Sequence, residues 1–80
     1  MTHTNLKLLA VLIAADVKVT LYRKPGAPQT VVGEFPDTPD NRSLIESYER
    51  RLVLDIPQKS IMQAYVELGY ERKRLLMEAL

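Results

Sequence analysis

The chain has 80 residues, of which 46% are hydrophobic, and eleven basic against ten acidic side chains give a formal net charge of +1. This length fits one small domain with a modest core, and the apolar fraction argues against an intrinsically disordered chain. The near-zero charge gives little support to strong nonspecific binding of nucleic acid. The absence of cysteine excludes disulfides and cysteine zinc sites and is consistent with a cytoplasmic protein.

The first regular element is expected in the apolar run of residues 8–15, which contains neither glycine nor proline. The run is far shorter than the roughly 20 residues that span a membrane, and it is at the short end for the core of a signal peptide. Leucine and alanine favour helix over strand. We therefore expect a buried helix from Asn5 to about Ala15, capped by Thr4.

A β-hairpin is expected next. Residues 17–23 alternate and are rich in β-branched side chains, with Val17, Val19 and Leu21 on one side. Residues 24–28 contain two prolines and a glycine and predict a turn, and residues 30–35 predict the return strand. Residues 36–41, with Pro36 and Pro39, are expected to form a connector to the C-terminal part.

Two or three helices are expected in the C-terminal part. Helical spacing over residues 43–55 predicts a helix that Asn41 or Ser43 caps and that ends before Pro57. The next helix is expected to begin at Gln58 or Ser60 and to end at residue 68, where Gly69 would adopt the left-handed conformation of a C-terminal cap. Glu71 would then open a last helix over residues 71–80. The alternative is one straight helix from about Gln58 to Leu80, because glycine inside a helix costs only about 1 kcal/mol. The predicted fold class is α+β, an N-terminal helix and a β-hairpin followed by two or three C-terminal helices.

Three short motifs carry a family resemblance: Tyr48-Glu49-Arg50 before Leu52-Val53-Leu54, Ala64 before Leu68-Gly69, and Arg72 and Leu75 after that glycine. On these motifs, residues 43–80 resemble the Fis-type helix-turn-helix, the DNA-binding end of many bacterial enhancer-binding regulators. The chain departs from the family at Tyr65, where the family has a small residue, and at residues 56–59, where a Gly-Asn pair is usual. The resemblance implies a turn at Gly69 and a recognition helix after it.

The leading functional hypothesis is a small DNA-binding regulator that acts as a homodimer through this helix-turn-helix. A recognition helix presents its N-terminal residues to the major groove, where cations contact phosphates and guanine. The candidate DNA contacts are Arg72, Lys73 and Arg74, together with Lys59 and with Arg23 and Lys24 at the hairpin tip. The plainer interpretation of the Arg72 to Arg74 cluster is a solvated helix face that pairs with neighbouring acids.

The competing hypothesis is a small protein-binding module or inhibitor, such as a phage- or mobile-element-encoded accessory protein that blocks a larger protein complex. It rests on the near-zero net charge and the lack of a catalytic set. It also rests on the predicted strand 30–35, which as an edge strand could pair with the sheet of a partner.

No catalytic, metal or cofactor site is expected, so the chain is expected not to be an enzyme. His3 is the only histidine, the three glycines are isolated and form no phosphate loop, and no set of acids has metal-ligand spacing. Tyr48, Tyr65 and Tyr70 lie on the apolar sides of their predicted helices and are expected in the core. No membrane partner is expected.

Overall fold

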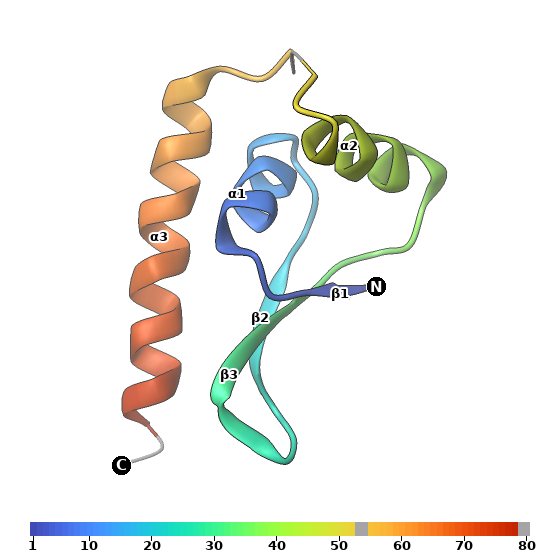
Figure 1. Ribbon diagram of the computed structural model, residues 1–80. Coiled ribbons are helices and arrows are strands. Elements are labelled where there is room, and N and C mark those ends of the chain that lie inside the picture. The colour runs from blue at the N-terminus through green and yellow to red at the C-terminus, as the bar shows by residue number, and fades with distance from the viewer. Residues whose placement is uncertain (53–54, 79–80) are drawn as a thin grey trace.

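The predicted α+β class is confirmed in the computed structural model, which describes residues 1–52 and 55–78 (Figure 1). The elements in chain order are β1 (Thr2–His3), α1 (Leu6–Ala14), β2 (Thr20–Lys24), β3 (Ala27–Glu34), α2 (Pro39–Glu49) and α3 (Gln58–Met77). Nothing in the sequence pattern predicts β1. Four residues that were predicted to be helical lie outside the described residues: Val53, Leu54, Ala79 and Leu80.

The predicted N-terminal helix is confirmed as α1, with slightly different ends. Asn5, not Thr4, caps it, because the side-chain oxygen of Asn5 accepts hydrogen bonds from the backbone N–H groups of Lys7 at 3.0 Å and Leu8 at 3.3 Å. The helix ends just before Asp16, whose φ of 64° lies in the left-handed region. No helix in the described part of the chain combines the length and apolarity that a membrane crossing requires.

The predicted hairpin is confirmed as β2 and β3, although β2 begins at Thr20 rather than at residue 17. Lys24 pairs with Ala27 around a turn at residues 25 and 26. Pro25 and Gly26, with φ of 80° at the glycine, suit the central positions of a type II turn. Both strand pairings are antiparallel, in the order β1-β3-β2.

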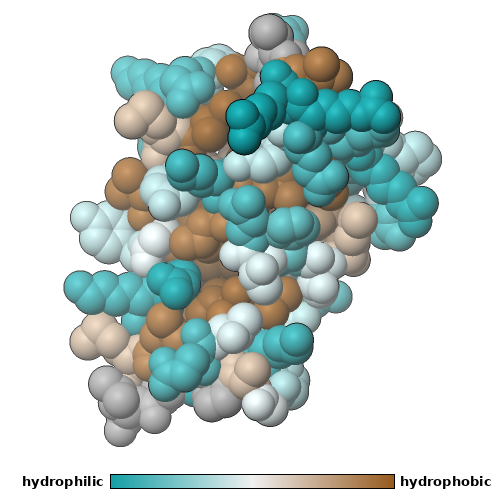
Figure 2. Space-filling view, viewed as in Figure 1, coloured by the Kyte–Doolittle hydropathy of each residue, from teal (hydrophilic) through white to brown (hydrophobic). Residues whose placement is uncertain are grey.

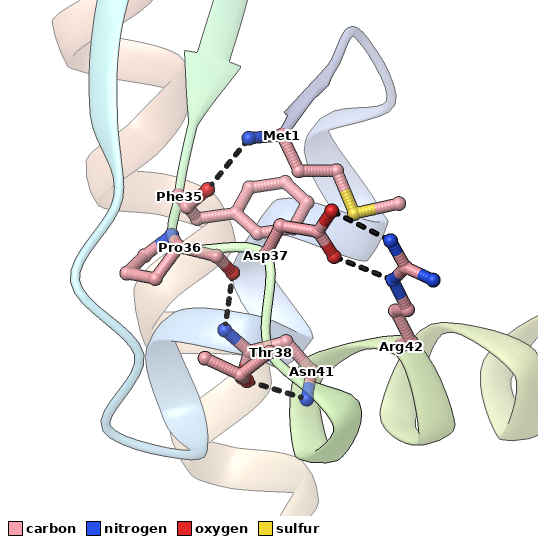
Figure 3. Close-up of polar contacts among 7 residues, drawn as sticks. All are labelled: Met1, Phe35, Pro36, Asp37, Thr38, Asn41 and Arg42. Atoms are coloured by element: carbon pink, nitrogen blue, oxygen red, sulfur yellow. Dashed lines mark hydrogen bonds and ion pairs between the residues drawn. The ribbon is translucent and has the colours of Figure 1, made fainter.

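The prediction that residues 30–35 form a free edge strand is wrong at the C-terminal end of β3. β1 pairs there, with Thr2 opposite Glu34 and His3 opposite Gly33. The amine of Met1 also donates to the carbonyl oxygen of Phe35 at 2.9 Å (Figure 3). A chain segment more than thirty residues away in sequence therefore occupies the place where a partner's strand was expected.

The connector before α2 is shorter than the predicted 36–41, and neither Asn41 nor Ser43 caps the helix. The hydroxyl of Thr38 accepts a hydrogen bond from the backbone N–H of Asn41 at 3.1 Å, and Pro39 is the first helical residue (Figure 3). Asn41 is buried instead, and its side-chain amide donates to the carbonyl oxygen of Pro36 at 2.7 Å. These bonds fix the direction in which α2 leaves the sheet.

The predicted break at Leu68-Gly69 is wrong, because α3 is one continuous helix from Gln58 to Met77. Gly69 does not adopt positive φ. Ala64 and Leu68 are buried in the core before this point, and Leu75 is half-buried after it, so packing holds the helix in register on both sides. Glycine inside a helix costs only about 1 kcal/mol relative to alanine. The helix-turn-helix that required a turn at Gly69 is therefore not formed.

The core is organised around α1. Leu8, Leu9 and Leu12 are fully buried, and they form one cluster with Phe35, with Ile45 of α2, and with residues of α3. A Cβ added at Gly33 would lie 2.6 Å from both δ carbons of Leu9, so glycine permits the close approach of α1 to β3. α3 runs along one side of the molecule from the α2 end to the hairpin end, and its other side is uncovered (Figure 1).

Candidate protein-binding surface

The α3 helix carries apolar side chains on two opposite sides. Ala64 and Leu68 are buried against the core, and Ile61 packs at its margin. On the opposite side, the exposed fractions are 60% for Met62, 53% for Val66, 72% for Tyr70 and 58% for Met77. We call this side the outer face of α3 and define it by the residues Met62, Val66, Gly69, Tyr70, Lys73 and Met77.

The outer face is a continuous row rather than a scatter of exposed residues. Met62, Val66 and Tyr70 follow one another at four-residue spacing, and Lys73 and Met77 continue on the same side. Isolated exposed apolar residues are normal, whereas contiguous apolar patches mark interaction sites. Moving a large apolar side chain fully out of water is worth roughly 1.5–3 kcal/mol, so covering this row would contribute several kcal/mol.

A groove joins the outer face to the rest of the molecule at the N-terminal half of α3. Its volume is about 460 Å³, and Met62 and Val66 belong both to the groove and to the outer face. Figure 2 shows apolar surface between the polar side chains over α3 and beside it. The other apolar residues that line the groove are Val11 of α1, Tyr48 of α2, and Ile61 and Tyr65 of α3. The site therefore offers both a ridge and a hollow for apolar side chains.

Gly69 lies in the middle of the outer face. A Cβ added there would meet no heavy atom within 4 Å, so no contact within the described chain requires glycine. Its missing side chain leaves the helix backbone open between Val66 and Tyr70. Small residues at such a place let a second backbone or a bulky side chain approach a helix closely.

Charge is distributed unevenly around α3. Arg74 pairs with both Glu71 and Glu78, and the hydrogen bond from Arg74 holds the pKa of Glu71 below its ordinary value. Among the ion pairs of the described residues, none involves Lys59, Arg72 or Lys73. Lys59 and Lys73 are exposed on the side of α3 that carries the apolar row, so the uncovered apolar surface has a positive rim.

The structure separates the residues that were predicted to contact DNA. Arg72, Lys73 and Arg74 lie in the last turns of α3 rather than in the first turns of a recognition helix. Lys59 lies in the first turn, about 20 Å away along the helix axis. The hairpin turn that follows Lys24 lies at the same end of the molecule as the C-terminus of α3 (Figure 1). Arg74 already forms ion pairs with Glu71 and Glu78.

The sequence pattern missed most of the outer face. Tyr48 is half-buried and packs against the core as predicted, but Tyr65 and Tyr70 are exposed, so their assignment to the core is wrong. The spacing of Met62, Val66 and Tyr70 was the available signal. It could not be read because the predicted break at Gly69 divided the row between two helices.

Within residues 1–52 and 55–78, no three histidine, aspartate or glutamate side chains gather in a way that could hold a metal ion. A comparison of the chain with known protein families, with curated proteins and with solved structures finds no match. The physical properties of the outer face therefore carry the functional argument.

Proposed function

We propose that this chain is a small non-enzymatic binding protein that docks on a larger protein through the outer face of α3. The observation that supports the proposal is the row of large, exposed apolar side chains on the side of α3 that faces away from the core. A surface helix in a chain that acts alone usually keeps its uncovered side polar. Here one side of α3 packs against the core, and a second apolar side is exposed to solvent.

The charge of the outer face indicates the chemistry of the partner. Lys59 and Lys73 accompany the apolar row, and the acids of α3 that form ion pairs, Glu71 and Glu78, are tied to Arg74. An apolar segment with acidic side chains at its edges would therefore fit best, because opposite charges at the rim of an interface raise the association rate and exclude wrong partners. A binding protein of this size would act by occluding the surface on which it docks.

The experiment that tests this function uses two variants that each add one glutamate to α3. Val66→Glu places a charge in the apolar row, and Ser60→Glu places the same charge at an exposed position in the first turn, where an acidic residue is favourable. The immobilised wild-type chain should retain one protein, in a fixed ratio to itself, from extracts of the cells in which it occurs. Val66→Glu should lose that protein, and Ser60→Glu should retain it. Equal retention by all three chains would contradict the proposal.

DNA binding is the second candidate function. It is favoured by three cations of α3 that form no ion pair with any of the described residues, Lys59, Arg72 and Lys73. Each phosphate contact releases counterions, so affinity for random-sequence duplex should collapse between about 50 mM and 200 mM salt. Fluorescence anisotropy at these two salt concentrations measures the effect. Arg72→Ala and Lys73→Ala should each weaken binding if this function is correct, and absence of binding at the lower salt concentration would eliminate it.

A further inference from the structure

We propose that the groove beside α3 is a binding site for a small amphipathic anion, a carboxylate on an unbranched apolar chain. The apolar chain of this ligand would lie in the hollow between α1 and α3, and its carboxylate would pair with Lys7. Such a site goes beyond the proposed function and does not depend on it, because the groove is present in the chain alone.

The groove has the size and the lining of a small-molecule site. Its volume of about 460 Å³ lies within the range of roughly 300–1,000 Å³ that is usual for such sites, which are mostly apolar and commonly lie between helices. The least exposed lining residues come from three different helices: Val11 of α1, Tyr48 of α2 and Ile61 of α3. A ligand in the groove would therefore contact every helix of the fold.

The shape of the groove fits a narrow chain. Its lining on α3 runs from Gln58 to Val66, which is about 12 Å at the rise of an α-helix. Its lining on α1 is Lys7 and Val11, one helical turn apart, and α1 packs against α3 (Figure 1). An elongated apolar hollow that is bounded by two packed helices suits an unbranched alkyl chain.

The charge of the groove fits an anion. Among the described residues that line it, Lys7 alone is charged, and no ion pair of the described residues includes Lys7. The first turn of α1 contains no acidic residue, so the positive end of the helix dipole adds to the charge of Lys7. A cation in the first turn does not stabilise a helix. A bound carboxylate would offset both positive charges, which gives Lys7 a role that the free chain does not provide.

The remaining polar groups of the lining do not oppose an anion. They are the side-chain amide of Gln58 and the hydroxyl groups of Tyr48 and Tyr65. All three are neutral and can donate hydrogen bonds. The groove thus combines an apolar hollow with one cation and neutral donors, and this combination matches a carboxylate with an apolar tail.

Amide NMR of the isotope-labelled full chain, titrated with decanoate at low salt, tests the site. Decanoate should shift the signals of Lys7, Val11 and Tyr65 saturably, with a Kd of about 1 mM or below. Decyltrimethylammonium carries the opposite charge on the same chain and should bind roughly fivefold or more weakly. Absence of saturable shifts up to about 5 mM decanoate, or shifts confined to residues outside the groove, overturns the proposal.

The length of the alkyl chain tests whether the tail enters the groove. From octanoate to decanoate to dodecanoate, each added methylene should lower Kd by up to roughly fourfold, because it removes more apolar surface from water. Equal affinity for the three carboxylates would mean that only the head group is bound, and the proposed site would be wrong.

Two charge reversals separate a contact at Lys7 from general attraction of anions. Lys7→Glu should reverse the preference, so that decyltrimethylammonium binds more tightly than decanoate. An acidic residue is favourable in the first turn of α1, so this variant should fold. Lys59→Glu is the matched control, because Lys59 is an exposed neighbour of Gln58 that does not line the groove. It should keep the preference for decanoate. Equal loss of that preference in both variants, or its retention in Lys7→Glu, overturns the pairing with Lys7.

The groove and the outer face share Met62 and Val66, but the two proposals fail separately. A chain that binds decanoate as expected but retains no protein from extracts has the ligand site without the docking function. A chain that retains a protein but binds none of the carboxylates has the docking function without the ligand site.

Discussion

Replacing Gly69 with alanine should stabilise the folded chain, although this position was predicted to be a helix end. Gly69 lies inside α3, does not have positive φ, and leaves open space where the new methyl group would stand. No steric cost therefore offsets the gain in helix propensity, which is about 1 kcal/mol for alanine over glycine in a helix interior. For a domain of this size, that free energy raises Tm by roughly 4–8 °C.

Gly26→Ala is the matched control. A Cβ at Gly26 would also meet nothing within 4 Å, but the φ of Gly26 is +80°. A left-handed conformation costs a residue with a Cβ roughly 1–2 kcal/mol, so this variant should be destabilised. Glycine-to-alanine substitution is thus expected to raise the free energy of unfolding at position 69 and to lower it at position 26. Because both positions have open surroundings, the difference between the two changes measures the effect of backbone conformation alone.

Urea and thermal unfolding followed by circular dichroism measure both changes. The comparison belongs at a concentration of a few µM or less, because any self-association would add stability that depends on concentration. If Gly69→Ala destabilises the dilute chain as Gly26→Ala does, α3 is broken at Gly69 and the outer face is not continuous.

Three further changes test the core and the start of α2. Gly33→Ala should cost roughly 1–3 kcal/mol of unfolding free energy, because its Cβ would lie 2.6 Å from the δ carbons of the fully buried Leu9; an unchanged urea midpoint would refute this close approach. Asn41→Ala removes a buried hydrogen bond and should cost about 1–3 kcal/mol, whereas a Tm equal to that of the wild type would show that water replaces it freely. The side-chain hydrogen bond from Arg42 holds the pKa of Asp37 below its ordinary value. The stability from this pair is therefore present above about pH 4 and is lost as the pH falls through the lowered pKa of the folded state. Asp37→Asn should accordingly flatten the acid part of the curve of urea midpoint against pH at low salt, and an identical curve would show that the pair contributes nothing.

Short-range sequence patterns alone were sufficient to predict α1 and the β-hairpin. The apolar run without glycine or proline specified α1, and alternation on both sides of Pro25 and Gly26 specified the hairpin. These features follow from periodicity and from the backbone preferences of single residues, which act within a few positions.

Tertiary structure decided the features that depend on distant residues or on small energy differences. A glycine fits a helix end and, at a cost of about 1 kcal/mol, a helix interior, so only the packing of α3 on α1 could choose between them. The pairing of β1 with β3 joins residues more than thirty positions apart, which no local pattern indicates. The existence of the outer face depends on whether Gly69 ends the helix or lies inside it, because Met62, Val66 and Tyr70 form one apolar row only if α3 continues through Gly69.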